Sequence, residues 1–474
     1  MGRWLERAIT LHRWLGLAVG PLMVVWCASG MVMIYMPYPR LTEATRRSAL
    51  EPLAWPERVA RSFDAPGPGP LEPESIEMLG GRAVLRTDRG SMVEVESGAL
   101  VPALTAEQAA RVAVGFAARL AASGSEPAAP ELLGVVDRDV WTFSGVPGYE
   151  RPLYRFAFAN AAGTEVYVSR VSGKVVQATT RTQRAWTWVG AIPHWLYLAA
   201  LRRHARIWAS VVVIASLAGS FLAALGLGIG VVQLTGRGRP RSGALYAAHH
   251  STGLVFGVVT LTWVLSGLLS MNPAGVLESG DDRSARAGLR GEPSSASLWA
   301  ALGALARSPA RETAVHVEVA PLSGHVYFVF DDGNGHRARV DETGGGAPLL
   351  HGDLRRALDP LTGGAALELL DTSDDYLRNV ERKPVYRAVT EDPERTRYYV
   401  DALSGQLRAV LDRNARGYRW LFEVPHRLDV PLLRGRPQWD IVMLVLLSGA
   451  LGLSATGLLL GARRWWTANR PGGR

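Results

Sequence analysis

The stretch His12-Arg-Trp-Leu-Gly-Leu-Ala-Val-Gly20 occurs twice in this chain, because it returns 237 positions later as His249-His-Ser-Thr-Gly-Leu-Val-Phe-Gly257. The two copies stay aligned without a gap to a Ser-Gly pair, Ser29-Gly30 in the first and Ser266-Gly267 in the second. In each copy a histidine lies at the N-terminal end of an apolar helix. We therefore predict a duplicated membrane unit that binds a ligand through its histidines.

Composition supports a membrane protein with large polar inserts. Of 474 residues, 48% are apolar and only 20% are charged, and the apolar residues are concentrated in four long uncharged runs. The formal charge of +9 comes mostly from arginines spread along the chain, without a helix-turn-helix, zinc-ligand or RNA-binding signature. We therefore expect no nucleic-acid partner.

The four apolar runs predict a membrane-embedded four-helix bundle. The first run, from Trp14 to Tyr35, is too long for a signal-peptide core and lacks an Ala-x-Ala cleavage site, so we expect it to be retained. Four spans place both termini on the same side of the membrane. The predicted transmembrane helices cover residues 12–36, 207–234, 244–271 and 439–462.

Arginines near the helix ends predict the orientation. The basic segments expected in the cytoplasm contain Arg3, Arg7, Arg13, Arg237, Arg239, Arg241, Arg463, Arg464 and Arg470. This orientation places both termini in the cytoplasm of a bacterium and exports residues 37–193 and 272–425 across the inner membrane to the periplasm. Four arginines at the opposite face are instead expected to bind an anionic ligand, namely Arg202, Arg203, Arg434 and Arg436.

Each exported segment predicts an α+β domain. In the first, Thr105-Ala-Glu-Gln108 is typical of a helix-capping box and is followed by alternating strand patterns with a Ser172-Gly173 turn. In the second, the strand patterns recur around a Ser404-Gly405 turn, 232 positions later. The internal two-fold repeat therefore includes the exported domains and extends to the motif Pro-His-x-Leu, which begins at Pro193 and again at Pro425.

This repeat pairs the histidines at two levels. His12 and His249 lie at the predicted cytoplasmic ends of spans one and three, whereas His194 and His426 precede spans two and four on the periplasmic side. A pseudo-two-fold axis along the membrane normal brings the members of each pair to opposite faces of a flat ligand. Two imidazoles bind haem iron axially and leave no open position, which suits electron transfer. Cys27 is the only cysteine, so these two haems b would be held without covalent attachment.

The two histidine-led helices, the hairpin Asp401-Ala-Leu-Ser-Gly405 and the four-span layout resemble the PepSY-associated transmembrane family. This family includes iron-regulated inner-membrane proteins of the ferric-siderophore reductase type. The resemblance implies a di-haem protein that moves electrons to a periplasmic ferric chelate. One departure is Ser169, which replaces the hairpin aspartate in the first copy and predicts the loss of a surface contact there.

Several residues allow a second interpretation. His250 competes with His249 as a ligand, although only His249 keeps the four-residue spacing to its glycine. His204 has no counterpart and is expected to contact a lipid headgroup or to support the periplasmic haem. Glycines of the repeated stretch serve helix packing or let a macrocycle approach the backbone. Four other histidines lack metal-ligand spacing and are expected at the surface, namely His316, His325, His336 and His351.

Motifs for other chemistries are absent from the sequence, including His-Glu-x-x-His, Gly-x-Ser-x-Gly and a nucleotide-binding glycine loop. Electrons would thus come from membrane quinol or a cytoplasmic reductase, and we predict a membrane reductase of ferric siderophores or other Fe(III) chelates. The alternative is a haem-free binding or sensor protein that modulates a peptidase or binds a periplasmic ligand. A chelate transporter is disfavoured because the spans lack mid-membrane charges and broken helices.

Overall fold

The computed structural model describes residues 3–62, 72–121, 129–235, 243–370, 374–376 and 384–468. The chain divides into two compact units. The helical unit contains residues 1–38, 182–278 and 414–474, and the β-rich unit contains residues 39–181 and 279–413. Four arginines that served to predict the orientation lie outside the described residues, namely Arg237, Arg239, Arg241 and Arg470.

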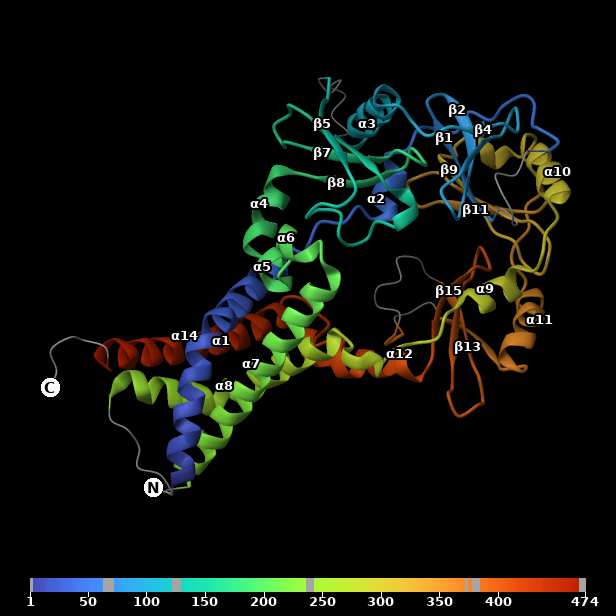
Figure 1. The fold of residues 1–474 in the computed structure, drawn as a ribbon. Helices are drawn as coiled ribbons and strands as arrows, with labels where there is room; N and C mark the ends of the chain where they lie inside the picture. Colours follow the sequence, from blue (N-terminus) through green and yellow to red (C-terminus); the bar gives the residue numbers. More distant parts are fainter. Residues whose placement is uncertain are drawn as a thin grey trace. The chain divides into compact units, whose positions relative to one another are not determined.

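Four long apolar helices form most of the helical unit (Figure 1). They are α1 (Arg3–Tyr35), α7 (Ala205–Leu234), α8 (Ala244–Ser270) and α14 (Gln438–Ala468). Each is longer than the roughly 20 residues that cross the hydrocarbon core of a bilayer. Both α1 and α8 pack against α7 and α14. The prediction of four helices able to span a membrane is confirmed.

Short helical elements precede α7 and α14. They are α4 (Arg181–Val189), α5 (Ala191–Trp195) and α6 (Ala199–Arg202) before α7, and α12 (Arg413–Tyr418), a π-helical turn (Arg419–Glu423), α13 (Val424–Arg427) and a 3₁₀ turn (Pro431–Leu433) before α14. The Pro-His-x-Leu motifs form α5 and α13, and each ends at a leucine in the left-handed region. The φ angles are 53° at Leu196 and 49° at Leu428. Such a conformation costs about 1–3 kcal/mol and persists only where the surroundings impose it, so each turn holds its histidine in a defined position.

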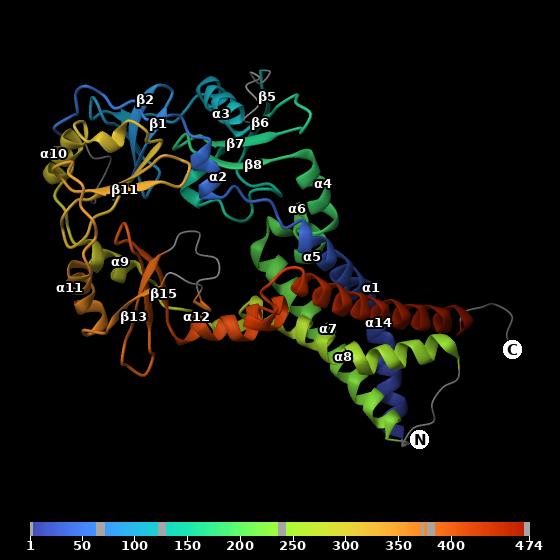
Figure 2. The same cartoon turned by 180° about the vertical axis from the view of Figure 1, so that it is seen from behind.

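Strands in the described residues form three antiparallel sheets in the β-rich unit (Figure 2). The largest has the order β11-β10-β9-β1-β2-β3-β4 and consists of β1 (Pro73–Leu79), β2 (Arg82–Thr87), β3 (Met92–Glu94), β4 (Leu100–Val101), β9 (His316–Val319), β10 (Phe328–Asp331) and β11 (Arg337–Val340). The second contains β5 (Glu131–Val136), β6 (Leu153–Ala157), β7 (Glu165–Ser169) and β8 (Val175–Thr179). The third contains β12 (Leu367–Leu370), β13 (Val385–Val389), β14 (Arg397–Asp401) and β15 (Leu407–Leu411).

The largest sheet joins two segments that are distant in sequence. Strand β1 pairs antiparallel with β9, with Ser75 opposite Glu318 and Ile76 opposite Val317. The segments 37–193 and 272–425, which the sequence suggested as separate domains, therefore share a sheet and a hydrophobic core. Alternating patterns predict strands but do not reveal which strand pairs with which, so this connection was not visible in the sequence.

The two four-stranded sheets share the same order and the same irregularity. Pairing of β7 with β8 shifts register between Tyr167 and Val168. Pairing of β14 with β15 shifts between Tyr399 and Val400, 232 positions later. A bulge is a specific local feature, so its presence at matching positions supports the correspondence seen in the sequence.

Ser169 and Asp401 make the same local contacts in their hairpins. The Asp401 Oδ1 atom accepts hydrogen bonds from the backbone N–H groups two and three residues later, and Ser169 Oγ does the same. Both side chains are buried. The expected loss of a contact at Ser169 therefore concerns a buried position and not the surface. The contact missing from the first hairpin is the ion pair that Asp401 makes with Arg337 and Arg408.

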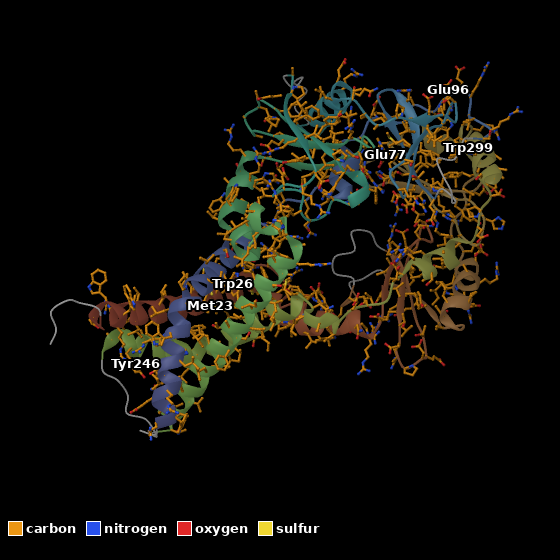
Figure 3. All side chains as sticks on the ribbon, in the orientation of Figure 1. Met23, Trp26, Glu77, Glu96, Tyr246 and Trp299 are labelled. Atoms are coloured by element: carbon orange, nitrogen blue, oxygen red, sulfur yellow. The ribbon has the colours of Figure 1, made fainter. Side chains whose placement is uncertain are left out.

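Helices cover these sheets. They are α2 (Glu43–Ser48), α3 (Ala106–Ala121), α9 (Arg283–Arg290), α10 (Ser295–Leu305) and α11 (His351–Thr362), with 3₁₀ turns at Gly148–Glu150, Pro273–Gly275 and Pro309–Arg311. The predicted capping box forms at the start of α3, where Gln108 Oε1 accepts from the Thr105 N–H and Thr105 Oγ1 accepts from the Gln108 N–H. Apolar residues of α10 complete the core of the seven-stranded sheet, with Trp299 almost fully buried (Figure 3).

A buried ionic cluster connects β1 to β9 and α2. The Glu77 carboxylate accepts two hydrogen bonds from Arg46, one from Arg86 and one from His316 Nδ1, at 2.6 to 3.2 Å. Burial alone would raise the pKa of Glu77, but Arg46, the hydrogen bond from His316 and Arg86 hold this pKa well below its usual range. His316 is 3% exposed, so its expected position at the surface is wrong. The sequence could not show this because its partner Glu77 lies 239 positions away.

Candidate functional site

The first histidine pair lies between α1 and α8. His12 and His249 face each other with their ring centroids 6.2 Å apart and their planes inclined by 41°. His249 Nδ1 donates to the carbonyl of Leu453 at 3.2 Å and lies 3.3 Å from Thr456 Oγ1. With Nδ1 carrying the proton, Nε2 keeps its lone pair for a ligand. His12 Nδ1 is buried beside the Leu222 backbone, the counterpart of Leu453, although no contact of this atom among the described residues meets hydrogen-bond geometry.

The second pair lies between the short helices α5 and α13. His194 and His426 also have ring centroids 6.2 Å apart, with planes inclined by 67°. Their Nδ1 atoms contact matching groups at 3.1 to 3.2 Å, namely the Trp26 carbonyl and Ser29 Oγ for His194, and the Trp263 carbonyl and Ser266 Oγ for His426. Burial lowers the pKa of His194 to about 4, and burial together with His194 lowers that of His426 to about 3. Both imidazoles are thus neutral near pH 7, as metal ligands must be.

The spacing of both pairs fits a metal ion bound between two imidazoles. Two metal–nitrogen bonds of about 2 Å, together with the distance from each nitrogen to its ring centroid, separate the centroids by roughly 6 Å. Nδ1–H groups held by backbone carbonyls are the usual second contact of a ligating histidine. Among the described residues, no cluster of three or more His, Cys, Asp or Glu side chains could hold a metal ion. A haem would suit such a site, because its ring nitrogens supply the four equatorial ligands and two imidazoles are enough to complete the coordination.

A cavity of about 380 Å³ surrounds the first pair. Each of the four long helices contributes a Gly-x-x-x-Gly pair to its wall. These glycines are Gly16, Gly20, Gly226, Gly230, Gly253, Gly257, Gly457 and Gly461. The cavity extends from Tyr246, near the start of α8, to Met23 in α1, and Figure 3 shows both side chains on the long helices. A largely apolar cavity lined by glycines of four helices is the kind of space in which a macrocycle could bind.

At two positions the histidine rings leave no room for a side chain larger than that of glycine. A Cβ atom on Gly226 would lie 2.7 Å from His12 Cε1, and one on Gly457 would lie 2.8 Å from His249 Cε1. At the second pair, Gly30 and Gly267 leave more room, since a Cβ there would lie 3.6 Å from the imidazole. Each candidate ligand therefore packs against a glycine of a neighbouring helix.

The comparison with known families identifies a membrane family. The sequence matches the family model described as PepSY-associated TM region over residues 9–368. The chain belongs to the PepSY-associated TM family. The matched residues contain three of the four candidate ligands, His12, His194 and His249, and end within β12. No curated protein matches the sequence.

Within this family member, the structure distinguishes His249 from its neighbour. His250 also lines the cavity, but its ring stacks on Tyr246 with 6.1 Å between centroids and an inclination of 7°. It is His249 that faces His12. His204 immediately precedes α7 and is exposed.

Three of the four arginines expected to bind an anion have side-chain contacts within the helical unit. Arg202 lies over the Trp208 ring at 4.4 Å. Arg434 pairs with Asp429 at 3.2 Å, and Arg436 pairs with Asp440 at 3.4 Å. Arg203, at the end of α6, is exposed. The structure therefore gives three of these side chains an intramolecular role.

Sequence reasoning missed half of the cavity wall. The glycines of α7 and α14 follow their own repeat, in which Gly226 and Gly230 recur 231 positions later as Gly457 and Gly461. This repeat could have predicted the other half of the wall, because the two glycines of each pair are four residues apart, as are the glycines after His12 and His249. The contact of each glycine with a histidine of another helix has no signature within a single segment.

Proposed function

We propose that this family member is a di-haem b electron-transfer protein that reduces ferric siderophores or other Fe(III) chelates. The observation that carries the proposal is the geometry of the two histidine pairs, each with ring centroids 6.2 Å apart. A haem bound between two imidazoles accepts and releases single electrons without binding oxygen.

In this proposal the protein is a four-helix bundle with an internal two-fold repeat in the bacterial inner membrane. Both termini lie in the cytoplasm and both β-rich segments lie in the periplasm. The His12/His249 pair then forms the inner site, close to quinol or a cytoplasmic reductase. The His194/His426 pair forms the outer site. One electron delivered to an Fe(III) chelate yields Fe(II), which hard oxygen donors bind more weakly, so iron is released.

The residues around each site have defined tasks in this scheme. Backbone carbonyls hold Nδ1–H of three of the imidazoles, which fixes the orientation of their rings and directs Nε2 into the gap. The glycines let the helices approach the macrocycle closely, and the apolar wall excludes water. Binding of the chelate near Arg202, Arg203, Arg434 and Arg436 stays a prediction, and Arg203→Gln is the variant that tests it without breaking an ion pair described above.

The decisive experiment measures haem content. Purified wild-type protein is expected to show a Soret band, a dithionite-reduced minus oxidised spectrum of the b type, and two haems per chain. Replacing both His194 and His426 with alanine should leave one haem, and so should replacing both His12 and His249. The matched control His351→Ala lies in the β-rich unit and should retain two.

Two results would contradict the proposal. A colourless wild-type protein would support the alternative of a haem-free binding or sensor protein. Unchanged haem content after replacement of either pair would show that these histidines are not the ligands. For the reductase step, reoxidation of the reduced protein by a ferric chelate should be faster than with the matching gallium chelate, which has the same shape but accepts no electron.

A further inference from the structure

The cavity around His12 and His249 is apolar along most of its length and polar at the inner end. The polar side chains of its wall include Arg13 from α1, Arg464 from α14, and Gln233, Tyr246 and His250 from α7 and α8. The described lining contains no carboxylate. A ligand that matches this wall is apolar over most of its surface and anionic at one edge.

The two-fold repeat is broken at this end of the cavity. Arg13 corresponds to His250 at the offset of 237, and Arg464 corresponds to Gln233 at the offset of 231. The two arginines lie on α1 and α14, which pack against each other, so positive charge gathers on one side. On the other side, Tyr246 donates a hydrogen bond to Gln233 Oε1 at 2.6 Å and stacks on His250. A ligand with two identical halves gains nothing from this asymmetry, whereas a ligand with one acidic edge is oriented by it.

We infer that Arg13 and Arg464 bind the carboxylate edge of the tetrapyrrole and so determine how it lies in the inner site. This inference rests on the proposed function. Haem b carries two carboxylates on one edge, and guanidinium groups bind carboxylates through strong charge-assisted hydrogen bonds. With that edge at the cationic end, the apolar remainder of the ring lies among the glycines.

The positive charges also act on the iron through space. Reduction adds an electron to the site, so nearby cations stabilise the reduced form and raise the midpoint potential. Arg13 and Arg464 are positioning residues in this scheme. Their removal should change two quantities, the preference for a diacid tetrapyrrole and the potential of one haem.

The test uses purified full-length protein stripped of haem and reloaded in detergent with haem b or its dimethyl ester, which lacks the charges. For wild-type protein we expect one of the two equivalents to bind the diacid roughly tenfold more tightly than the diester. The double variant Arg13→Gln/Arg464→Gln should lose this preference and show a lower midpoint potential for one haem. Arg463→Gln removes the neighbouring charge, which does not line the cavity, and should behave as wild type.

The possible outcomes separate this inference from the proposed function. If wild-type protein binds neither compound, the proposed function fails. If wild-type protein binds haem b and its diester equally tightly, both with bis-histidine spectra, the inference about the arginines is overturned and the haem sites stand. The same conclusion follows if the double variant still binds the diacid more tightly than the diester. Circular dichroism of the double variant verifies that it is folded, and a lower potential with normal haem content then excludes a general loss of structure.

Discussion

The imidazoles of the two pairs differ in how Nδ1 is held. His194 and His426 each contact a serine hydroxyl and a backbone carbonyl, and His249 contacts a carbonyl and a threonine hydroxyl. The neighbour of His12 is the Leu222 backbone, 231 positions before Leu453, but no contact of His12 Nδ1 among the described residues meets hydrogen-bond geometry. A hydrogen-bonded Nδ1–H makes Nε2 a stronger electron donor. We therefore expect the inner site to combine one strong and one weaker axial ligand.

The glycines that face the imidazoles provide a sharp residue-scale prediction. Gly226→Ala and Gly457→Ala each place a methyl group less than 3 Å from a histidine Cε1, so the ring must shift away from its position. Haem content should fall from about two toward one per chain, with the outer site retained. A matched control is Gly228→Ala in the same helix, where a Cβ meets nothing within 4 Å. Pyridine haemochrome analysis measures the difference, and equal haem content in all three variants would contradict the contact.

The choice between adjacent histidines is tested in the same way. His249→Ala should abolish the inner haem, because no other imidazole faces His12 at 6.2 Å within the described residues. His250→Ala should keep both haems, since this ring stacks on Tyr246. Redox titration resolves the two haems by potential. Loss of the inner haem in His250→Ala alone would reverse the assignment.

At the scale of elements, the charged cluster around Glu77 stabilises the contact of β1 with β9 and α2. Replacing Glu77 with glutamine removes the buried carboxylate that pairs with Arg46 and Arg86, and leaves Arg46 only its pair with the more exposed Glu43. Breaking a buried ion pair in this way typically costs about 3–5 kcal/mol in the free energy of unfolding. The exposed pair of Glu107 with Arg111 provides the control, and Glu107→Gln should cost less than about 1 kcal/mol.

Hydrogen exchange localises this effect. Peptides from β1 and β9 of Glu77→Gln should exchange faster than those of wild-type protein, whereas peptides from α7 and α8 should be unchanged. Equal exchange in β1 and β9 would mean that the cluster does not hold these strands together.

The same cluster predicts how stability depends on pH. Burial lowers the pKa of His316, and the pKa of Glu77 is also held below its usual range. The unfolded chain therefore binds these protons more readily than the folded one, so acid favours unfolding. Stability should be full above about pH 6.5 and decline below it as His316 of the unfolded chain protonates, with a further decline below about pH 4.5 from Glu77. Urea unfolding between pH 8 and 5 measures the first decline, and His316→Gln should flatten it.

The sequence largely predicted which segments form helices and strands, but it did not predict which strands and side chains contact one another. The four spans, the α3 capping box and the strands around the Ser-Gly turns follow from local patterns, and all are present. The pairing of β1 with β9 and the burial of His316 depend on residues more than 200 positions apart. At the site, the repeat revealed which histidines correspond, but the glycine opposite each ring depends on helix packing.

For the whole molecule, the seven-stranded sheet predicts that neither β-rich segment folds alone. Residues 39–181 expressed alone would leave the edge of β1 unpaired, and residues 279–413 would leave β9 unpaired. Exposed edges of this kind promote aggregation. We expect both segments to be poorly soluble separately and to form a stable complex when coexpressed, as size-exclusion chromatography would show. Cooperative unfolding of either isolated segment would contradict this expectation.

In the order β11-β10-β9-β1-β2-β3-β4, the strands of the second β-rich segment lie on one side of the sheet and those of the first on the other, and they meet where β9 pairs with β1. The central ladder is antiparallel, with Ser75 opposite Glu318 and Ile76 opposite Val317, as in a contact between two identical surfaces. In a protein with a single copy of the repeat, that ladder would have to form between two chains. In this chain the covalent link between the two halves replaces that association, so the ladder forms at any protein concentration and the halves need not be identical, as the arginines at one side of the inner cavity illustrate.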